Sequence, residues 1–320
     1  MAINLLGRNF LTLKDFTQEE IIYLIDLAIK LKSEKQKGIF KNRLKNKNIA
    51  MIFEKTSTRT RCATSVACYD EGAHAEFLGM NDIQMGKKES LEDTSRVLGR
   101  MYDAILFRGY KQETAEKLYD LSGVPVINGL TDEYHPTQAL ADFMTVKEVF
   151  GSLKDKKLAF VGDGNNNVVR SLMICAAKIG VDMSVGAPKK LWPDKEIMSY
   201  INEIKTNNIE ITEDPKKAVK DADVIYTDVW ISMGEEKNPG VKSKIDSLKP
   251  YEVNNKLMQA TGKDSTIFLH CLPASHKNGK HYMEVTEEVF ESEKSFVFDE
   301  AENRLHTIKA ILVSILKGKI

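Results

Sequence analysis

Residues 57–61 read Ser-Thr-Arg-Thr-Arg and place three hydroxyl groups and two guanidinium groups within five positions. The apolar run 49–53 precedes them and a run without glycine or proline follows, which predicts a strand, a turn and the start of a helix. The free N–H groups of a helix N-terminus, with hydroxyls and a guanidinium beside them, suit a phosphate or another dianion. An ordinary capped surface helix with two solvated arginines explains the same pattern equally well.

The two arginines of this segment cannot both bind one ligand. At about 100° per residue, Arg59 and Arg61 point about 200° apart around a helix. We therefore expect Arg59 to contact the ligand and Arg61 to form a structural ion pair.

Other polar residues end predicted strands in the first half of the chain. Arg108 ends one strand, and Gly109 after it favours a close approach of the backbone. In residues 135–138, His-Pro-Thr-Gln, the proline at the first helical position holds His135 outside the helix and places Gln138 in its first turn. A single histidine is more often structural, but this fixed placement makes a ligand role for His135 an equal alternative.

Residues 162–167, Gly-Asp-Gly-Asn-Asn-Asn, follow a predicted strand and open a predicted helix, so a dinucleotide site has to be considered. Asn167 occupies the position of the third glycine in that fingerprint, and no acidic residue ends the next strand near Gly186. The sequence therefore argues against NAD. Asparagine amides at this turn can instead hydrogen-bond a small polar ligand.

Further candidate site residues lie at the ends of predicted strands, and near the last predicted helix, in the second half of the chain. Asp228 ends a strand before a glycine-containing loop, where a carboxylate can bind an amino group, whereas Glu235 and Glu236 in that loop are expected to be solvated. Cys271 ends another strand, and on its own it is more often a small hydrophobe than a catalytic thiol. Arg304, near the start of the last predicted helix, is a further cation that can return to the site.

Composition narrows the possible partners. The 320 residues include 46 basic and 46 acidic side chains, and this zero net charge argues against nucleic acid or a membrane surface as the main partner. No charged leader with a long apolar stretch opens the sequence and no run reaches about 18 apolar residues, so we expect a soluble cytoplasmic protein. The four cysteines form no Cys-x-x-Cys pair, which predicts free thiols and no zinc site.

The elements that position these residues alternate between strand and helix along the chain. Residues 17–20 form a capping box that predicts a first helix, and a final helix is expected from about 301 to 315. The alternation predicts an α/β fold with two doubly wound parallel-sheet domains joined by a linker at 151–157, with ligands beyond the carboxyl ends of the strands. The predicted strands are 49–53, 74–78, 104–107, 124–127, 158–162, 183–186, 209–211, 224–228, 266–270 and 295–298. The helices between them are predicted from 58 onward and at 90–100, 113–121, 136–149, 168–179, 195–205 and 215–220.

Taken together, these motifs resemble those of the aspartate/ornithine carbamoyltransferase family, and in particular those of its ornithine-using members, over essentially the whole chain. The Ser-Thr-Arg-Thr and His-Pro-Thr-Gln motifs belong to carbamoyltransferases generally, whereas Ser-Met-Gly at 232–234 and His-Cys-Leu-Pro at 270–273 indicate ornithine. The matching segments are 53–61, 107–110, 135–138, 228–234, 270–273 and 302–304.

The resemblance implies transfer of a carbamoyl group from carbamoyl phosphate to the δ-amine of L-ornithine, giving L-citrulline and phosphate with no metal and no organic cofactor. It implies a carbamoyl phosphate-binding domain, 1–150, with a C-terminal helix, 302–320, that packs back on it, and an ornithine-binding domain, 151–301. An active site in the cleft between the domains, a Ser-Met-Gly loop that closes over the substrates, a cis Leu272-Pro273 bond and homotrimers or multiples of trimers are also implied.

The resemblance also implies roles for individual residues, with Gln84 supplied by a neighbouring subunit. The residues implied for carbamoyl phosphate are Ser57, Thr58, Arg59, Thr60, Gln84, Arg108, His135, Pro136, Thr137, Gln138, Cys271, Leu272 and Arg304. Those implied for ornithine are Asn167, Asp228, Ser232 and Met233. Catalytic roles are implied for Arg59, Arg108, His135, Asp228 and Cys271.

Other functions remain to be weighed against this one. An aspartate-type enzyme needs cations for a second carboxylate, but segments 228–236 and 270–274 contain neither arginine nor lysine. A putrescine-type enzyme binds no amino acid head group, so Asp228 and Ser232 would have no ligand group to bind. The missing third glycine disfavours a nucleotide-dependent oxidoreductase, and intact Arg59, His135 and Cys271 disfavour a silent homologue. A colorimetric citrulline assay separates these functions.

Overall fold

The computed structural model describes residues 3–232, 234–235, 237–276 and 283–318, and the chain forms two compact units. The first unit comprises Met1–Met144 and Glu302–Ile320, and the second comprises Thr145–Ala301. The units divide inside helix α5 (Pro136–Phe150) and not in the segment 151–157 that the sequence analysis takes as the linker. The α5 sequence has proline only at its first position, so no residue interrupts the helix at the division.

The first unit is built around one parallel sheet. Its elements in chain order are η1 (Leu13–Asp15), α1 (Gln18–Gln36), β1 (Asn48–Phe53), α2 (Thr58–Asp70), β2 (His74–Gly79), α3 (Leu91–Met101), β3 (Ala104–Arg108), α4 (Gln112–Ser122), β4 (Val126–Leu130), the first part of α5 and most of α12 (Val297–Lys317).

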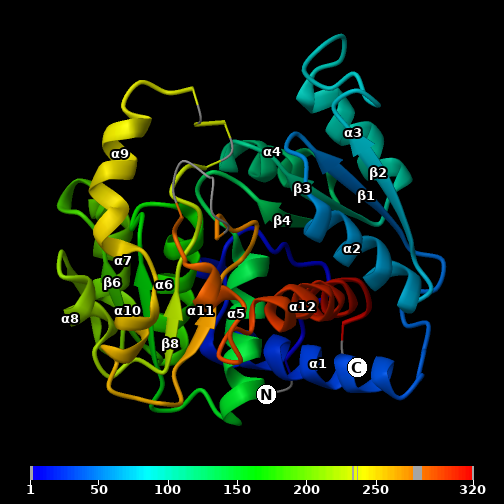
Figure 1. Cartoon of the computed structure of the whole chain (residues 1–320). Helices are drawn as coiled ribbons and strands as arrows, with labels where there is room; N and C mark the ends of the chain where they lie inside the picture. Colours follow the sequence, from blue (N-terminus) through cyan, green and yellow to red (C-terminus); the bar gives the residue numbers. More distant parts are fainter. Residues whose placement is uncertain (1–2, 233, 236, 277–282, 319–320) are drawn as a thin grey trace. The chain divides into compact units, whose positions relative to one another are not determined.

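The four strands of this sheet are parallel and follow the order β2-β1-β3-β4. The chain turns to one side of β1 to form β2 and then to the other side to form β3 and β4. Right-handed crossovers therefore put α2 on one face and α3 and α4 on the other, as Figure 1 shows. The register aligns Phe53 of β1 with Arg108 of β3, so the carboxyl ends of these strands meet where the order reverses. Ligands of α/β sheets bind at such a point.

The second unit contains a second parallel sheet. Its elements are the end of α5, β5 (Lys157–Val161), α6 (Asn167–Ile179), β6 (Asp182–Gly186), η2 (Lys189–Leu191), α7 (Lys195–Ile204), β7 (Ile209–Thr212), α8 (Pro215–Val219), β8 (Val224–Tyr226), α9 (Val241–Leu248), η3 (Lys249–Tyr251), α10 (Asn255–Gln259), β9 (Ile267–Leu269), α11 (Glu287–Phe290) and the start of α12.

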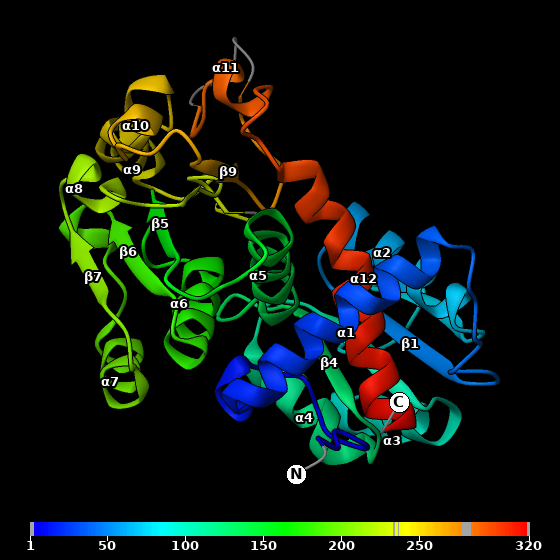
Figure 2. The same ribbon diagram turned by 90° about the horizontal axis from the view of Figure 1, so that it is seen from below.

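The five strands of the second sheet are parallel in the order β7-β6-β5-β8-β9. The order reverses between β5 and β8, which places the second point for ligand binding at the carboxyl ends of these two strands. In Figure 2, α6 and α7 lie on one face of the sheet, and α8 and α10 lie on the other. The predicted fold class, two doubly wound parallel-sheet units, is confirmed.

Helix α12 packs on α1 and α2 of the first unit, as expected for the C-terminal helix (Figures 1 and 2). The Nζ atom of Lys309 lies 2.6 Å from Oδ2 of Asp70, and both side chains are buried. The Nζ atom of Lys32 donates to Oδ1 of Asn303 at 2.8 Å. Paired charges inside the contact hold the helix in one position, because either group left alone there would be costly.

One predicted element is wrong, and three short helices were not predicted. The strand predicted at 295–298 is absent among the described residues: Ser295 forms an isolated bridge with Phe268, and α12 begins at Val297. Asp299 and Glu300 stand in the first turn of α12, where acidic residues favour a helix N-terminus. Helices α9, α10 and α11 were not predicted, because they are short, with 8, 5 and 4 residues. The other predicted elements are present with ends displaced by a few residues.

Apolar side chains of the strands form the core of each unit. In the first unit, residues of β1 and β3 pack against those of α4, and in the second unit residues of β5, β8 and β9 pack against α8 and α10. Helices α3 and α7 keep polar faces, whereas α6 is buried on nearly all sides. Within the described part of the chain, no helix combines the length and apolar character needed to cross a membrane.

Candidate active site

The helix start predicted after the first strand is confirmed. Helix α2 begins at Thr58, and Oγ of Ser57 accepts a hydrogen bond from the N–H of Thr60 at 3.2 Å. This cap places the first turn of α2 at the carboxyl edge of the sheet, where the first N–H groups of any helix lack intrahelical acceptors. Thr58 is exposed and Arg59 is half-buried. The turn therefore presents the donors that an anion site needs.

Arg61 does not form the ion pair that we expected. Its guanidinium lies over the ring of Phe77, 3.8 Å from the centroid, and it has no carboxylate partner among the described residues. Phe77 belongs to β2, which packs beside α2, so the ring is available for a cation–π contact. The ion-pair prediction is wrong, and the separate roles of Arg59 and Arg61 stay a prediction.

Arg304 joins several segments that the sequence analysis assigns to carbamoyl phosphate. Its Nη1 atom donates to Oε1 of Gln138 at 2.7 Å, and its Nη2 atom donates to the hydroxyls of Thr60 at 3.2 Å and Thr137 at 3.1 Å. The amide nitrogen of Gln138 donates in turn to Oδ1 of Asp142 at 2.8 Å. One buried guanidinium therefore fixes the starts of α2 and α5 relative to α12.

His135 lies in the field of three arginines. Its imidazole is buried, with Nε2 3.5 Å from Nη1 of Arg304. Burial lowers the pKa of His135 well below 6.5, and the positive charges of Arg304, Arg108 and Arg59 lower the pKa further. His135 is therefore neutral at physiological pH. Because Nε2 faces a guanidinium donor, its proton resides on Nδ1. The three positive charges that add to the effect of burial also attract an anion.

Arg108 is held at the end of β3 by its neighbours. A Cβ atom at Gly109 would collide with the ring of Phe107 and the carboxylate of Glu54, so only glycine fits there. The same carboxylate accepts a hydrogen bond from the N–H of Tyr110 at 2.9 Å. The expected close approach of the backbone beside Arg108 is present, and it fixes the direction of the chain as it leaves the strand.

Gln84 lies in the loop between β2 and α3, and its side chain is exposed. The backbone carbonyl oxygen of Gln84 accepts hydrogen bonds from the N–H groups of Lys87 at 2.9 Å and of Lys88 and Glu89 at 3.2 Å. These bonds order the loop. A role for Gln84 in a neighbouring subunit stays a prediction.

Asp228 is the centre of a polar cluster in the second unit. Its Oδ1 atom accepts hydrogen bonds from the Cys271 thiol at 3.1 Å and the N–H of Val229 at 2.8 Å. Its Oδ2 atom accepts one from Nδ2 of Asn166 at 3.2 Å. Asn166, Asp228 and Cys271 follow β5, β8 and β9, which are neighbours in the sheet, so the strand order brings the three side chains together.

The structure shows that Asn166 contacts Asp228, whereas the sequence analysis named its neighbour Asn167 as a candidate site residue. Oδ1 of Asn166 accepts the N–H of Val169 at 2.8 Å and caps α6, which leaves its NH₂ group for Asp228. Asn167 is the first residue of α6 and is half-buried. In the same turn, a Cβ atom at Gly164 would lie 2.8 Å from the carbonyl oxygen of Leu191, so the turn requires glycine. The turn at 162–166 thus directs the amide of Asn166 toward the carboxylate of Asp228.

The pKa of Asp228 is raised above 3.8. Burial is the main cause, and the hydrogen bonds from Cys271 and Val229 offset only part of it. An amino group that binds beside Asp228 would supply the positive charge that this buried carboxyl lacks.

His270 supports the segment that carries Cys271 and Leu272. It is fully buried, and its Nδ1 atom accepts the N–H of Leu272 at 2.9 Å. The proton is therefore on Nε2, which donates to Oε1 of Glu284 at 3.1 Å. Leu272 has φ +58°, a left-handed conformation that leucine rarely adopts, and its bond to His270 helps to hold it there. The predicted cis Leu272-Pro273 bond is present.

Asp228, His270 and Cys271 also form the group of potential metal ligands found in the described part of the chain, with donor atoms within 4.8 Å of one another. Both ring nitrogens of His270 are already engaged, one by Leu272 and the other by Glu284. A metal ion would have to displace one of these bonds. The cluster is therefore explained by its hydrogen bonds.

The loop after Asp228 is tied to its surroundings. The N–H of Ser232 donates to Oε2 of Glu235 at 3.0 Å, and Nζ of Lys244 lies 3.0 Å from the same oxygen. The expectation that Glu235 is merely solvated is therefore wrong, because an intraloop hydrogen bond and an ion pair hold it. Met233 and Glu236 lie outside the described residues.

Sequence reasoning did not find several residues that support the site. Asp142 is four positions after Gln138 on one helix, a spacing that predicts contact and could have revealed it. To predict the role of Asn166, the N-cap of α6 would have had to be located to within one residue. Glu284 and Glu300, which bond to the side chain and backbone of His270, are brought there by long-range folding and have no local signal.

Two family descriptions match the chain. One, "Aspartate/ornithine carbamoyltransferase, carbamoyl-P binding domain", covers residues 8–148. The other, "Aspartate/ornithine carbamoyltransferase, Asp/Orn binding domain", covers residues 154–315. The two matches meet close to the division between the structural units.

Relatives and solved structures agree with these matches. A catabolic ornithine carbamoyltransferase of Bacillus cereus is 53% identical over 98% of this chain and 97% of its own length. An ornithine carbamoyltransferase of Caldanaerobacter subterraneus is 54% identical over 99% of this chain and 100% of its own. The structure of ornithine carbamoyltransferase from Pyrococcus furiosus has a TM-score of 0.92 at 42% identity and 99% coverage of both chains.

Two doubly wound units with polar sites at their strand ends, matched over nearly their full length by transferases, define a two-domain α/β transferase. The chain belongs to the aspartate/ornithine carbamoyltransferase family.

Proposed function

We propose that the protein transfers the carbamoyl group of carbamoyl phosphate to the δ-amine of L-ornithine, giving L-citrulline and phosphate. The observation that carries the proposal is the arrangement around His135, where a neutral buried imidazole lies in the field of Arg59, Arg108 and Arg304. Such a site suits a small dianionic donor. The choice of ornithine as acceptor rests on relatives of 53% and 54% identity that carry the name ornithine carbamoyltransferase.

The first unit, 1–144 and 302–320, is proposed to form the carbamoyl phosphate-binding domain, for which the resemblance implies 1–150 and 302–320. The first turn of α2, with Arg59 and the hydroxyls around it, binds the phosphate group. Arg108, His135 and Gln138 bind the carbamoyl group. The other residues proposed to contact or position this donor are Ser57, Thr58, Thr60, Pro136, Thr137, Arg304, Cys271, Leu272 and, from a neighbouring subunit, Gln84.

The second unit, 145–301, is proposed to bind ornithine; the resemblance implies 151–301 for this domain. Asp228 binds the α-amino group, and Asn167 binds the head group from the turn after β5. Ser232 and Met233 contribute from the loop after β8. This assignment is supported by the buried carboxylate of Asp228, which has hydrogen-bond donors around it but no arginine or lysine in segments 228–236 and 270–274.

The proposed reaction uses positive charge and hydrogen-bond donors. The neutral δ-amine attacks the carbamoyl carbon, the bond from that carbon to the phosphate oxygen breaks, and the amine loses a proton. Negative charge grows first on the carbamoyl oxygen, near Arg108 and the Nδ1–H of His135, and then on the departing phosphate, near Arg59 and the start of α2. Fixed donors at such positions are typically worth about 10²–10³ in rate each. No step changes an oxidation state, and we propose no metal and no organic cofactor.

We also propose the oligomeric state, the cellular location and the metabolic role of the enzyme. Family resemblance supports a homotrimer or a multiple of trimers, in which Gln84 reaches a neighbouring subunit. We propose a cytoplasmic enzyme of arginine metabolism, as the family resemblance implies. Light scattering of the purified chain measures its assembly, and a monomer at assay concentration would contradict the subunit role of Gln84.

The function is tested by citrulline formation in a screen of acceptors. Purified protein with carbamoyl phosphate is offered L-ornithine, putrescine, L-aspartate and N-acetylornithine in parallel, and ureido products are measured colorimetrically. We expect turnover with ornithine and little with the other three. Preference for putrescine or aspartate, or no product with any acceptor, would overturn the proposal.

A further inference from the structure

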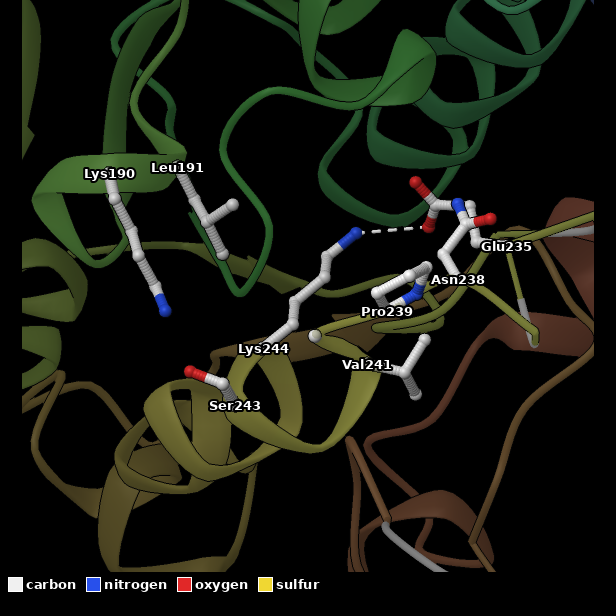
Figure 3. A pocket seen from close by; sticks show the side chains of 9 residues that line it. Lys190, Leu191, Glu235, Asn238, Pro239, Val241, Ser243 and Lys244 are labelled. Carbon is white, nitrogen blue, oxygen red and sulfur yellow. Dashed lines mark hydrogen bonds and ion pairs between the residues drawn. The ribbon is translucent and has the colours of Figure 1, made fainter.

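Lys244 of α9 bridges two separate segments of the second unit. Its Nζ atom lies 2.7 Å from Oδ2 of Asp163 and 3.0 Å from Oε2 of Glu235. Figure 3 shows the side chain extended toward Glu235 from the first turn of α9. Asp163 belongs to the turn after β5, and Glu235 belongs to the loop after β8.

Each of these carboxylates also fixes the backbone of its own segment. Oδ1 of Asp163 accepts the N–H of Asn165 at 3.0 Å, next to the asparagines that open α6. Oε2 of Glu235 accepts the N–H of Ser232 at 3.0 Å. A chain of four contacts therefore runs from the turn of Asn165, through Lys244, to the backbone of Ser232.

Asp163 and Lys244 are largely buried, so loss of a charge from the bridge is costly. The Asp163 side chain is 8% exposed and that of Lys244 is 18% exposed, whereas Glu235 is more open. Burial acts to lower the pKa of Lys244, but the charge of Asp163 and the hydrogen bonds to both carboxylates outweigh burial, and the pKa is raised. Removing the ammonium would leave a largely buried carboxylate without its partner, and the two acidic groups would repel each other.

We propose that Lys244 is a positioning residue for the amino acid acceptor. It sets the distance between the amides that follow β5 and the loop that carries Ser232, the two segments that flank Asp228. The inference rests on the proposed function, because it concerns how the ornithine site of that function is held. Lys244 itself contacts neither reacting group, so it acts through Asp163 and Glu235.

The surroundings allow a conservative replacement at this position. A cavity of about 380 Å³ adjoins Lys244 and is lined also by Lys190, Leu191, Asn238 and Ser243. A guanidinium is larger than an ammonium, and this space can accept it. Lys244→Arg therefore keeps the charge and can restore both ion pairs, whereas Lys244→Met keeps the length of the side chain and removes the charge.

The test compares steady-state kinetics of Lys244→Met, Lys244→Arg and a matched control, Lys249→Met. Lys249 forms an exposed ion pair with Asp246 at 2.7 Å shortly after the same helix, so its loss controls for removal of a lysine ion pair. We expect Lys244→Met to raise KM for ornithine about tenfold or more, the scale of a charged hydrogen bond. KM for carbamoyl phosphate should not change within error. Lys244→Arg should recover most of the loss, and Lys249→Met should match the wild type.

A second variant covers the case in which Lys244→Met fails to fold. Glu235→Gln keeps the shape of the side chain and removes one charge of the bridge, and it should raise KM for ornithine in the same selective way. An unchanged KM for ornithine in both folded variants would overturn the inference, as would equal losses for both substrates. Absence of citrulline formation by the wild type would instead refute the proposed function.

Discussion

Arg304 and Gln138 are 166 positions apart in the sequence, yet Nη1 of Arg304 donates a hydrogen bond to Oε1 of Gln138 at 2.7 Å. The bond ties α12 to the first turn of α5, and the same guanidinium reaches the hydroxyl of Thr60 in α2. Arg304 is 1% exposed, so its partners have little water to replace it. The C-terminal helix therefore holds together the segments of the proposed donor site.

Replacing Arg304 is expected to affect both stability and activity. In Arg304→Met, buried acceptors of Gln138 and Thr137 lose their donor, so the melting temperature should fall and kcat/KM for carbamoyl phosphate should drop about 10²-fold or more. The control is Arg96→Met, because Arg96 forms an exposed pair with Asp93 on α3. If the two variants behave alike in both measurements, Arg304 has no special role.

Arg59 and Arg61 provide a test of the helix-face argument. Arg59→Met should reduce turnover about 10²–10³-fold with little change in melting temperature, because it removes one fixed cation from the anion site. Arg61→Met loses only a surface contact with Phe77 and should keep nearly full activity. Circular dichroism checks that both variants fold. Equal activities of the two variants would remove the anion site from this turn.

Asp228→Asn is expected to impair function and to weaken the dependence of stability on pH. In the folded protein the pKa of Asp228 is raised, so the folded state binds more protons than the unfolded state above the ordinary value of 3.8. Stability is therefore lost as pH rises through that window, and at pH 7 the buried charge is a cost. Asp228→Asn removes the titrating group, so unfolding free energy should fall less with rising pH in the variant than in the wild type. Its melting temperature at pH 7 is not the test, because the new amide NH₂ faces donors such as Asn166. Urea unfolding at several pH values measures both slopes, and equal slopes would contradict the buried charge at Asp228.

The same Asp228→Asn variant separates the two substrates. KM for ornithine should rise far more than KM for carbamoyl phosphate, because the amide cannot neutralise an ammonium group. Initial rates measured while each substrate is varied in turn give both constants. An equal loss for both substrates would place Asp228 outside the acceptor site.

His306 is expected to reduce stability in acid. It is buried in α12, and burial together with the charges of Lys309, Lys32 and Lys35 lowers its pKa from 6.5 to about 3. The unfolded state therefore binds a proton that the folded state does not, and stability is lost as pH falls below 6.5. In His306→Asn, the slope of unfolding free energy against pH between about pH 6 and pH 4 should be smaller by about 1.4 kcal/mol per pH unit. Urea unfolding at several pH values measures this slope, and identical slopes would contradict the account.

Local sequence signals predicted most of the fold. The apolar runs marked the strands, and hydroxyl caps such as Ser57 and Thr17 marked helix starts, because these signals act within a few residues. The run Phe296-Val297-Phe298 misled the prediction, since its β-forming side chains lie at the beginning of a helix of 21 residues. There the packing of α12 overrides local preference.

The candidate site was less predictable than the fold. The strand-end rule found Arg108, His135, Asp228 and Cys271, which the strand order of each sheet brings to one edge. The partners that orient these residues are remote in sequence: Glu284 reaches His270, and Lys244 reaches Asp163. Such pairings depend on the completed fold and leave no pattern in a single sequence.

A crystal structure of the protein with a phosphonate analogue of carbamoyl phosphate tests the proposed anion site directly. We expect the phosphonate oxygens to lie at the first turn of α2, in contact with Arg59 and the hydroxyl and N–H groups of residues 57–60, with the carbamoyl-like group near Arg108 and His135. Density for the compound elsewhere, with this turn empty, would contradict this expectation.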